Sequence, residues 1–423
     1  MLEAVRNALR IADLRRKILY TFALLVVFRI GSFVPVPGVD AAALAQELGV
    51  TGGNIFGFLN LFSGGALGRF TVFAMGVNPY ITASIILQLL TIVIPRLEEL
   101  AKEGPEGRKV IQQYTRYGTV ALGIVQAIGI TALARSWGVI SDPNPLTFIT
   151  IVVTLTAGST FLMWLGEKIS EHGIGNGISL LIFAGIVAGV PVGAFNIFQA
   201  VGEGGINPFS LLFFAVAGLL VIAAVIMVQQ GQRRIPVQYA RRVVGRRMYG
   251  GSSTHIPMRI NQAGVIPVIF ASSVLFFPLT IAQFVPSIAP FVDRVIGIGT
   301  VGYNVLYFIL VIFFTYFYTA VTWNPVEVAD NMKKYGGFIP GLRPGKPTAQ
   351  YLDRVLSRLT LAGALFLAVI AVMPYVMAAI TRMPTSFLYF GGTGLLIVVG
   401  VALDTMKQIE AQLLMRHYEG FLK

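Results

Sequence analysis

Side chains that carry most enzyme and ion-transport chemistry are nearly absent from the apolar parts of this 423-residue chain. There is no cysteine, which excludes thiol catalysis, thiolate metal sites and redox switching. The nineteen acidic residues and three histidines fall in loops, tails or the ends of apolar runs, and only Arg29 lies inside one. We expect the Arg29 side chain to snorkel to the nearer membrane surface. With no phosphate-binding GxxxxGK(S/T) motif either, the sequence predicts neither an enzyme nor a bound cofactor.

Six neutral polar side chains within the apolar runs are candidates for lining a pathway, and five of them lie on the second and seventh runs. Such residues commonly form hydrogen bonds between membrane helices, and they can also face a pathway. The sequence leaves both roles open for Thr82, Ser84, Gln88, Gln126, Ser272 and Ser273.

These side chains must be positioned by membrane-spanning helices. The chain is 55% hydrophobic and 12% charged, with a mean hydropathy of +0.76, whereas soluble proteins are about 25% charged. Because about 20 apolar residues suffice to cross a bilayer, we predict ten spans. They cover residues 18–34, 72–94, 117–133, 146–166, 174–190, 209–228, 263–284, 301–321, 359–380 and 386–403.

The basic residues orient these spans. If both termini lie inside, 27 of the 32 Lys and Arg residues fall in inside segments and four in outside loops, with Arg29 within a span. This asymmetry satisfies the positive-inside rule and predicts that both termini are cytoplasmic. The expected parts are an N-terminal segment (1–17), two five-helix halves (18–190 and 209–403) and a C-terminal tail (404–423).

Two inside loops, residues 231–262 and 323–358, are too long for simple connectors. Basic residues near span ends often do no more than obey the positive-inside rule. The length of these loops, their paired arginines and their Gly/Pro turns favour an ordered projection that docks an anionic partner, such as ribosomal RNA or an acidic protein face. The candidate docking residues are Arg233, Arg234, Arg241, Arg242, Arg246, Arg247, Lys333, Lys334, Arg343 and Lys346.

An internal repeat links the second and seventh spans. Residues 75–84 and 263–272 share six identical positions in ten, including Gly76 with Gly264 and Pro79 with Pro267. The two spans are equivalent members of the five-span halves, and since five is odd, the halves must be inverted relative to each other. The alternative explanation for the similarity is a short sequence pattern that recurs where helices start.

Residues 54–67 are apolar and uncharged, yet too short to cross a bilayer. A re-entrant helix enclosed by protein and an interfacial helix on the outer face both fit this composition.

Five motifs, at residues 76–90, 113–118, 173–179, 263–267 and 341–345, resemble those of the SecY family, and the likeness extends over essentially the whole chain. Asn78 departs from the pattern, because an apolar residue is expected there, and it leaves the start of that helix uncertain. The resemblance implies an all-α polytopic membrane protein with ten transmembrane helices in two inverted five-helix halves around a central pore. The implied function is a channel in the bacterial plasma (inner) membrane. Such a channel passes unfolded secretory polypeptides and releases hydrophobic segments laterally into the bilayer.

The resemblance also implies a pore ring of aliphatic side chains, formed by Val77, Ile81, Ile178, Ile182, Ile269 and Ile397. Two pairs in this set are spaced i, i+4 and therefore stack on one helix face. A constriction of this kind excludes water and ions by dewetting and offers a passing chain no charge to bind.

By the same resemblance, residues 54–67 form a short re-entrant plug helix, and the six neutral polar residues lie at a lateral gate. This gate separates the second and third spans from the seventh and eighth. The implied plug residues are Asn54, Ile55, Phe56, Phe58, Leu59, Leu61, Phe62, Ser63, Gly64, Gly65 and Leu67. The implied partners are SecE and SecG subunits, the SecA motor ATPase, the ribosome, signal peptides, unfolded preproteins and membrane lipids.

An inverted-repeat secondary solute transporter is the alternative function. It requires a buried charge or a binding cluster near mid-membrane, which these spans do not supply.

Overall fold

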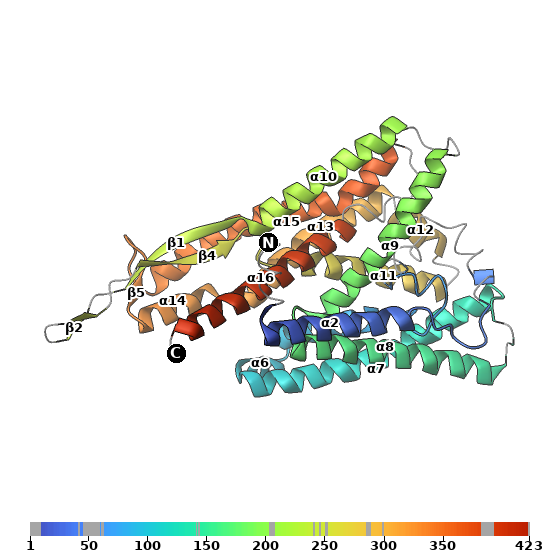
Figure 1. The fold of residues 1–423 in the computed structure, drawn as a ribbon, viewed down its shortest axis with the longest axis horizontal. Helices are drawn as coiled ribbons and strands as arrows, with labels where there is room; N and C mark the ends of the chain where they lie inside the picture. The colour runs from blue at the N-terminus through green and yellow to red at the C-terminus, as the bar shows by residue number, and fades with distance from the viewer. Residues whose placement is uncertain are drawn as a thin grey trace.

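The protein is described by a computed structural model over residues 10–40, 43–44, 60, 63–140, 142, 144–202, 208–239, 242–244, 247–249, 253–284, 289–297, 300–381 and 393–421. Helices dominate this part of the chain, and a strand ribbon extends from one end of the helical body (Figure 1). Each of the ten predicted spans overlaps a helix in its described part. The prediction of a mostly helical membrane protein with several spans is confirmed, and the count of ten stays a prediction. The overlapping helices are α2 (Ala12–Gly31), α5 (Asn78–Val93), α7 (Pro105–Ser136), α8 (Pro145–His172), α9 (Gly177–Gly202), α10 (Pro208–Gln230), α11 (Ile266–Phe284), α13 (Val301–Thr322), α15 (Lys346–Thr381) and α16 (Thr393–Phe421).

Length and composition allow five helical stretches among the described residues to cross a membrane. They are Pro105–Ser136, Pro145–His172, Gly177–Phe195, Val301–Lys334 and Lys346–Met377. Helices α5 and α6 (Pro95–Lys102) together form a sixth candidate, with a bend of 101° between them. The bend falls at Ile94, which is extended because the following proline disfavours helical backbone in the residue before it.

The second predicted span is helical from Asn78 rather than from residue 72. Gly76 takes a positive φ of 57°, and Pro79 follows in the first turn, where its missing N–H costs no hydrogen bond. Helix α11 starts in the same way, because Gly264 has φ 66° and Pro267 again occupies the second helical position. The two aligned segments therefore share a backbone conformation as well as residue types.

The two long loops fold into one unit. Strand β1 (Gln232–Tyr239) pairs antiparallel with β4 (Ser253–Arg259) on one edge and with β5 (Gly337–Phe338), from the other loop, on its second edge. Strands β2 (Arg242–Val244) and β3 (Arg247–Tyr249) pair at the tip of the ribbon (Figure 1). Helix α14 (Pro325–Lys334) and the start of α15 complete an apolar core, formed by Ile235, Val237, Met258, Met332, Ile339, Leu352, Val355 and Leu356.

The largest apolar cluster lies where the predicted halves meet. It includes buried side chains of α2, α5, α8 and α9 together with those of α10, α11, α13, α15 and α16. Helix α5 packs directly against α11 within this cluster. Many other large apolar side chains are exposed, such as Leu146, Val153 and Leu219, as expected for helices that face lipid. A further short helix, α12 (Ala289–Ile296), packs against α11 and α13.

Candidate functional site

The six predicted ring residues converge on one apolar cluster. Five are buried members of this cluster, with exposed fractions between 1% and 8%, and Ile178 packs against it. They come from α9, α11, α16 and the start of α5, which are far apart in the sequence. The fold thus supplies a charge-free aliphatic patch between the two predicted halves.

The first turns of α5 and α11 position two of these residues in the same way. The Ile81 N–H donates to the Val77 carbonyl at 3.1 Å, and the Ile269 N–H donates to the Val265 carbonyl at 3.3 Å. Both residues therefore lie one turn after the glycine that starts each segment.

The start of α9 positions Ile178 and Ile182. The Asn176 side chain caps this helix, because its Oδ1 accepts from the Ser179 N–H at 3.1 Å. Gly166 of α8 makes room for Ile178, since a Cβ at Gly166 would collide with the Ile178 side chain. Within the 173–179 motif, Asn176 thus caps the helix, and Gly175, with a positive φ, forms the turn that precedes it.

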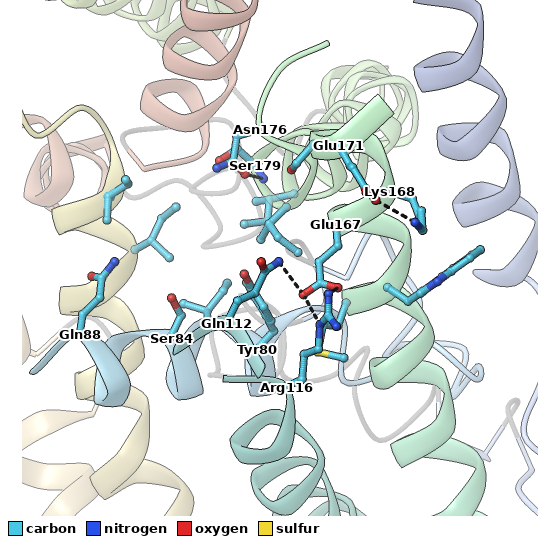
Figure 2. Close-up of a pocket in the computed structure, with 18 of the residues that line it drawn as sticks. Tyr80, Ser84, Gln88, Gln112, Arg116, Glu167, Lys168, Glu171, Asn176 and Ser179 are labelled. Atoms are coloured by element: carbon cyan, nitrogen blue, oxygen red, sulfur yellow. Dashed lines mark hydrogen bonds and ion pairs between the residues drawn. The ribbon is translucent and has the colours of Figure 1, made fainter. Parts of the chain in front are cut away.

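An open cavity of about 1110 Å³ lies against this patch. Its wall combines four of the predicted ring residues with polar side chains at the predicted cytoplasmic ends of α7 and α8. In Figure 2, Ser84 and Gln88 project from α5 toward the cavity. Its lining includes Tyr80, Ile81, Ser84, Gln88, Gln112, Gln113, Arg116, Glu167, Lys168, Glu171, Asn176, Ile178, Ser179, Ile182 and Ile269. We call this space the cytoplasmic funnel, after the side of the membrane that the basic residues predict for these helix ends.

Arg116 and Glu167 form a bidentate ion pair on the funnel wall. Arg116 Nη2 lies 2.9 Å from Glu167 Oε2, and Arg116 Nε donates to Glu167 Oε1 at 3.0 Å. Gln112 Nε2 also donates to Glu167 Oε1 at 3.1 Å (Figure 2). The pair joins α7 to α8 and leaves little net charge at this point of the wall. Sequence reasoning gave these residues no role, although an arginine and a glutamate at facing ends of consecutive spans were a usable signal.

The predicted gate hydroxyls bond within their own helices. Thr82 Oγ1 donates to the Asn78 carbonyl at 3.0 Å, while Ser272 and Ser273 both donate to the Ile269 carbonyl, at 2.8 and 2.9 Å. Ser84 and Gln88 line the funnel, and Gln126 is half-buried on α7. The described hydroxyl donors thus do not link α5 to α11.

The predicted plug is described only at its C-terminal end. Ser63, Gly64, Gly65 and Leu67 are described, whereas Asn54, Ile55, Phe56, Phe58, Leu59, Leu61 and Phe62 lie outside the described residues. Asn60 organises this end, because its Oδ1 accepts from the Gly68 N–H at 2.7 Å and its carbonyl accepts from the Gly65 N–H at 2.8 Å.

Arg29 reaches the same turn. Its Nη1 donates to the Gly64 carbonyl at 2.8 Å, and its guanidinium lies 4.8 Å from the centre of the Phe33 ring, which also faces Arg69. The side chain therefore bonds to the plug end, a contact that the snorkelling interpretation did not include. The two residues are 35 positions apart, and no local pattern in the sequence pairs them.

Six of the predicted docking residues have described side chains, and all six are exposed: Arg233, Arg234, Lys333, Lys334, Arg343 and Lys346. Arg242 and Arg247 lie on β2 and β3, while Arg241 and Arg246 fall outside the described residues. Within the described part of the chain, no group of three or more His, Asp or Glu side chains could hold a metal ion.

Comparisons with known proteins agree with this arrangement. A family model named SecY matches residues 71–406. The chain is 51% identical to the protein translocase subunit SecY of Mycobacterium tuberculosis strain H37Rv, and 50% identical to that of Halalkalibacterium halodurans, with complete coverage of both sequences in each case.

Solved structures share the fold. One described as "The structure of a protein conducting channel" superimposes with a TM-score of 0.67 at 22% identity, covering 93% of this chain and 91% of that one. Sec61 in the canine ribosome–channel complex from the endoplasmic reticulum gives a TM-score of 0.64 at 21% identity, with the same coverage.

Proposed function

This chain belongs to the SecY family, and from that premise we propose that it is the channel subunit of a bacterial protein translocase. It passes unfolded secretory polypeptides across the plasma membrane and releases their hydrophobic segments sideways into lipid. The observation that carries this proposal is an open funnel whose wall holds four of the six ring residues, from α5, α9 and α11, with all six in or against the same apolar cluster.

The chemistry of the patch suits a seal that any polypeptide can pass. Water leaves a narrow aliphatic constriction, so ions meet a dewetted barrier at rest. The same side chains offer no charge and no strong hydrogen bond to a passing chain. A solute transporter would instead need charged or ligand-binding side chains there.

We infer that the chain consists of two inverted five-helix halves, residues 18–190 and 209–403. Support comes from the shared start of α5 and α11, where a glycine of positive φ precedes a proline in the first helical turn. The direct packing of α5 on α11 supports a seam between the halves at the lateral gate. Interhelical hydrogen bonds in membranes contribute about 0.6 kcal/mol each. A seam whose described hydroxyls bond to their own helices therefore opens at little cost.

The plug proposal concerns residues 54–67. Its support is the ordered turn held by Asn60 and Arg29, which directs the chain back toward the patch before α5 begins. A plug anchored at this end blocks the outer side of the ring at rest and leaves when a polypeptide enters.

The cytoplasmic unit formed by the two long loops is the proposed docking site for a SecA motor and the ribosome. Its exposed basic residues suit an anionic surface. SecE and SecG subunits complete the complex in the membrane, and both termini of this chain face the cytoplasm.

Disulfide crosslinking tests the proposal, because the chain has no cysteine of its own. Ile81→Cys and Ile269→Cys should each capture a single-cysteine secretory chain stalled in transit. Val153→Cys, at a position 60% exposed on α8, serves as the lipid-facing control and should capture little. A stalled chain that reacts equally at all three positions, or at none, would contradict the pore assignment.

A further inference from the structure

A second cavity, of about 480 Å³, opens beside the cytoplasmic funnel. The two spaces share Asn176, Ser179, Ile266 and Tyr318 in their walls, so they adjoin each other. The remaining wall of this side pocket comes from the end of α10, the segment before α11 and the cytoplasmic part of α16. Whatever fills the funnel therefore lies next to the side pocket.

Two cations face one carboxylate in the lining. Arg259 Nη1 lies 3.9 Å from Asp404 Oδ1, at the outer limit of an ion pair, and about half of each side chain is exposed. Lys407 Nζ donates to the Gln229 carbonyl at 3.3 Å. The lining thus holds one more positive than negative charge.

Lys407 also lacks full electrostatic compensation. Burial lowers its pKa, and the charge of Arg259 lowers it further, while Asp404 and Glu410 act in the opposite direction. Since the net shift is downward, the two carboxylates do not offset burial and the neighbouring cation.

Side-chain amides fix the wall around these charges. Gln262 Oε1 accepts from the Arg259 N–H at 3.3 Å, and Gln408 Oε1 accepts from the Gly175 N–H at 3.0 Å. Gln408 thereby ties α16 to the turn that precedes α9. The pocket is therefore held by contacts from several elements.

We propose that the side pocket binds the carboxylate of an Asp or Glu side chain in the polypeptide that occupies the funnel. This inference rests on the proposed function, which supplies the polypeptide. A carboxylate there balances the excess charge of Arg259 and Lys407, and the four shared wall residues place the side pocket within reach of a polypeptide in the funnel. Acidic segments of a translocating chain are consequently held for longer at the cytoplasmic side than neutral ones.

The test uses Ala411→Cys, which reports on the side pocket, and Ser84→Cys, which reports on the funnel alone. A stalled secretory chain carries one cysteine flanked either by aspartates or by asparagines. Capture by Ala411→Cys should be about twofold to fivefold greater for the aspartate version, the ratio expected for a partly exposed ion pair. Ser84→Cys should capture both versions equally.

Adding Arg259→Gln and Lys407→Gln together should remove the preference at Ala411→Cys. Adding Arg259→Lys and Lys407→Arg should retain it, and so should Arg96→Gln with Lys102→Gln, which removes two charges from exposed positions on α6. Normal capture at Ser84→Cys in each variant shows that the channel is folded and occupied.

Equal capture of the aspartate and asparagine chains at Ala411→Cys, with normal capture at Ser84→Cys, would overturn the side-pocket proposal and leave the proposed function intact. Failure to capture any chain at Ser84→Cys in the parent protein would instead count against the proposed function, and the side-pocket proposal would fall with it.

Discussion

Arg29 shows how a single residue can connect the membrane body to the segment proposed as the plug. Its guanidinium donates to the Gly64 carbonyl, and Gly64 itself lies against the backbone of Gly185 on α9. The bond is charge-assisted, and such bonds contribute about 1.5 to 3 kcal/mol. Because Arg29 is only partly buried, the lower end of this range is the better guide.

Replacing Arg29 with methionine should therefore raise the resting ion conductance of the reconstituted channel about tenfold, since about 1.4 kcal/mol corresponds to a factor of ten. Single-channel recording in planar bilayers measures this. Arg69→Met is the matched control, because Arg69 faces the same Phe33 ring yet is exposed. Ile81→Gly, Ile182→Gly and Ile269→Gly combined give the reference leak of a broken ring. A tight Arg29→Met channel beside a leaky triple variant would show that this bond does not hold the plug.

Contacts at the residue scale were only partly predictable from the sequence. The ring residues stay a prediction from the family resemblance: Val77, Ile81 and Ile178 lie within its local motifs, whereas Ile182, Ile269 and Ile397 lie outside them. The Arg29–Gly64 bond and the Arg116–Glu167 pair join distant segments, which periodicity does not reveal. A hydroxyl such as that of Thr82 can donate either to a neighbouring helix or to the carbonyl one turn earlier on its own helix. Thr82 donates to the carbonyl on its own helix.

At the scale of the elements, close approach between α8 and the segment before α5 depends on Gly158. A Cβ on Gly158 would collide with the Val72 carbonyl, a backbone atom that cannot rotate away. On α10, a Cβ on Gly218 would meet no atom of the described residues within 4 Å, so Gly218 is the matched helical glycine without a packing role.

We expect Gly158→Ala to lower the free energy of unfolding by about 1 to 3 kcal/mol, the cost of overpacking. Gly218→Ala should be neutral or stabilising by up to about 1 kcal/mol, because alanine is the better helix former. Thermal unfolding of the purified protein in detergent compares the two variants. Equal melting temperatures would mean that α8 shifts freely away from Val72.

The ends of elements were harder to predict than their existence. Runs of about 20 apolar residues located a helix at each predicted span among the described residues, because bilayer thickness sets that length. The true start of α5 depends on Gly76 and Pro79, whose backbone preferences override the apolar run that begins at residue 72. Positive-inside counting could not predict that residues 232–239 pair with residues 337–338, since this contact joins two separate loops.

At the scale of the whole molecule, we expect the cytoplasmic unit to unfold independently of the membrane-spanning helices. Its core is a cluster of its own, with Ile235 2% exposed and paired across the ribbon with Ile256. A charge placed in that core has no partner and carries a large desolvation cost.

Ile235→Asp should therefore expose both loops to proteolysis and abolish binding of cytoplasmic partners, while the resting ion conductance stays unchanged. Limited proteolysis and bilayer recording on the same preparation measure both effects. Arg233→Gln, two residues earlier on the exposed face of β1, should leave the protease pattern intact. A leaky Ile235→Asp channel would show that the unit and the seal are coupled.

The joining of the two loops also has a mechanical consequence. Strand β1 follows α10 and β4 leads to α11, while α14 follows α13 and β5 leads to α15. All four attachment points belong to the same predicted half. If a motor docks on the cytoplasmic unit as proposed, its force loads the second predicted half as a block. The strain then concentrates where α11 meets α5, the proposed line of separation between the halves.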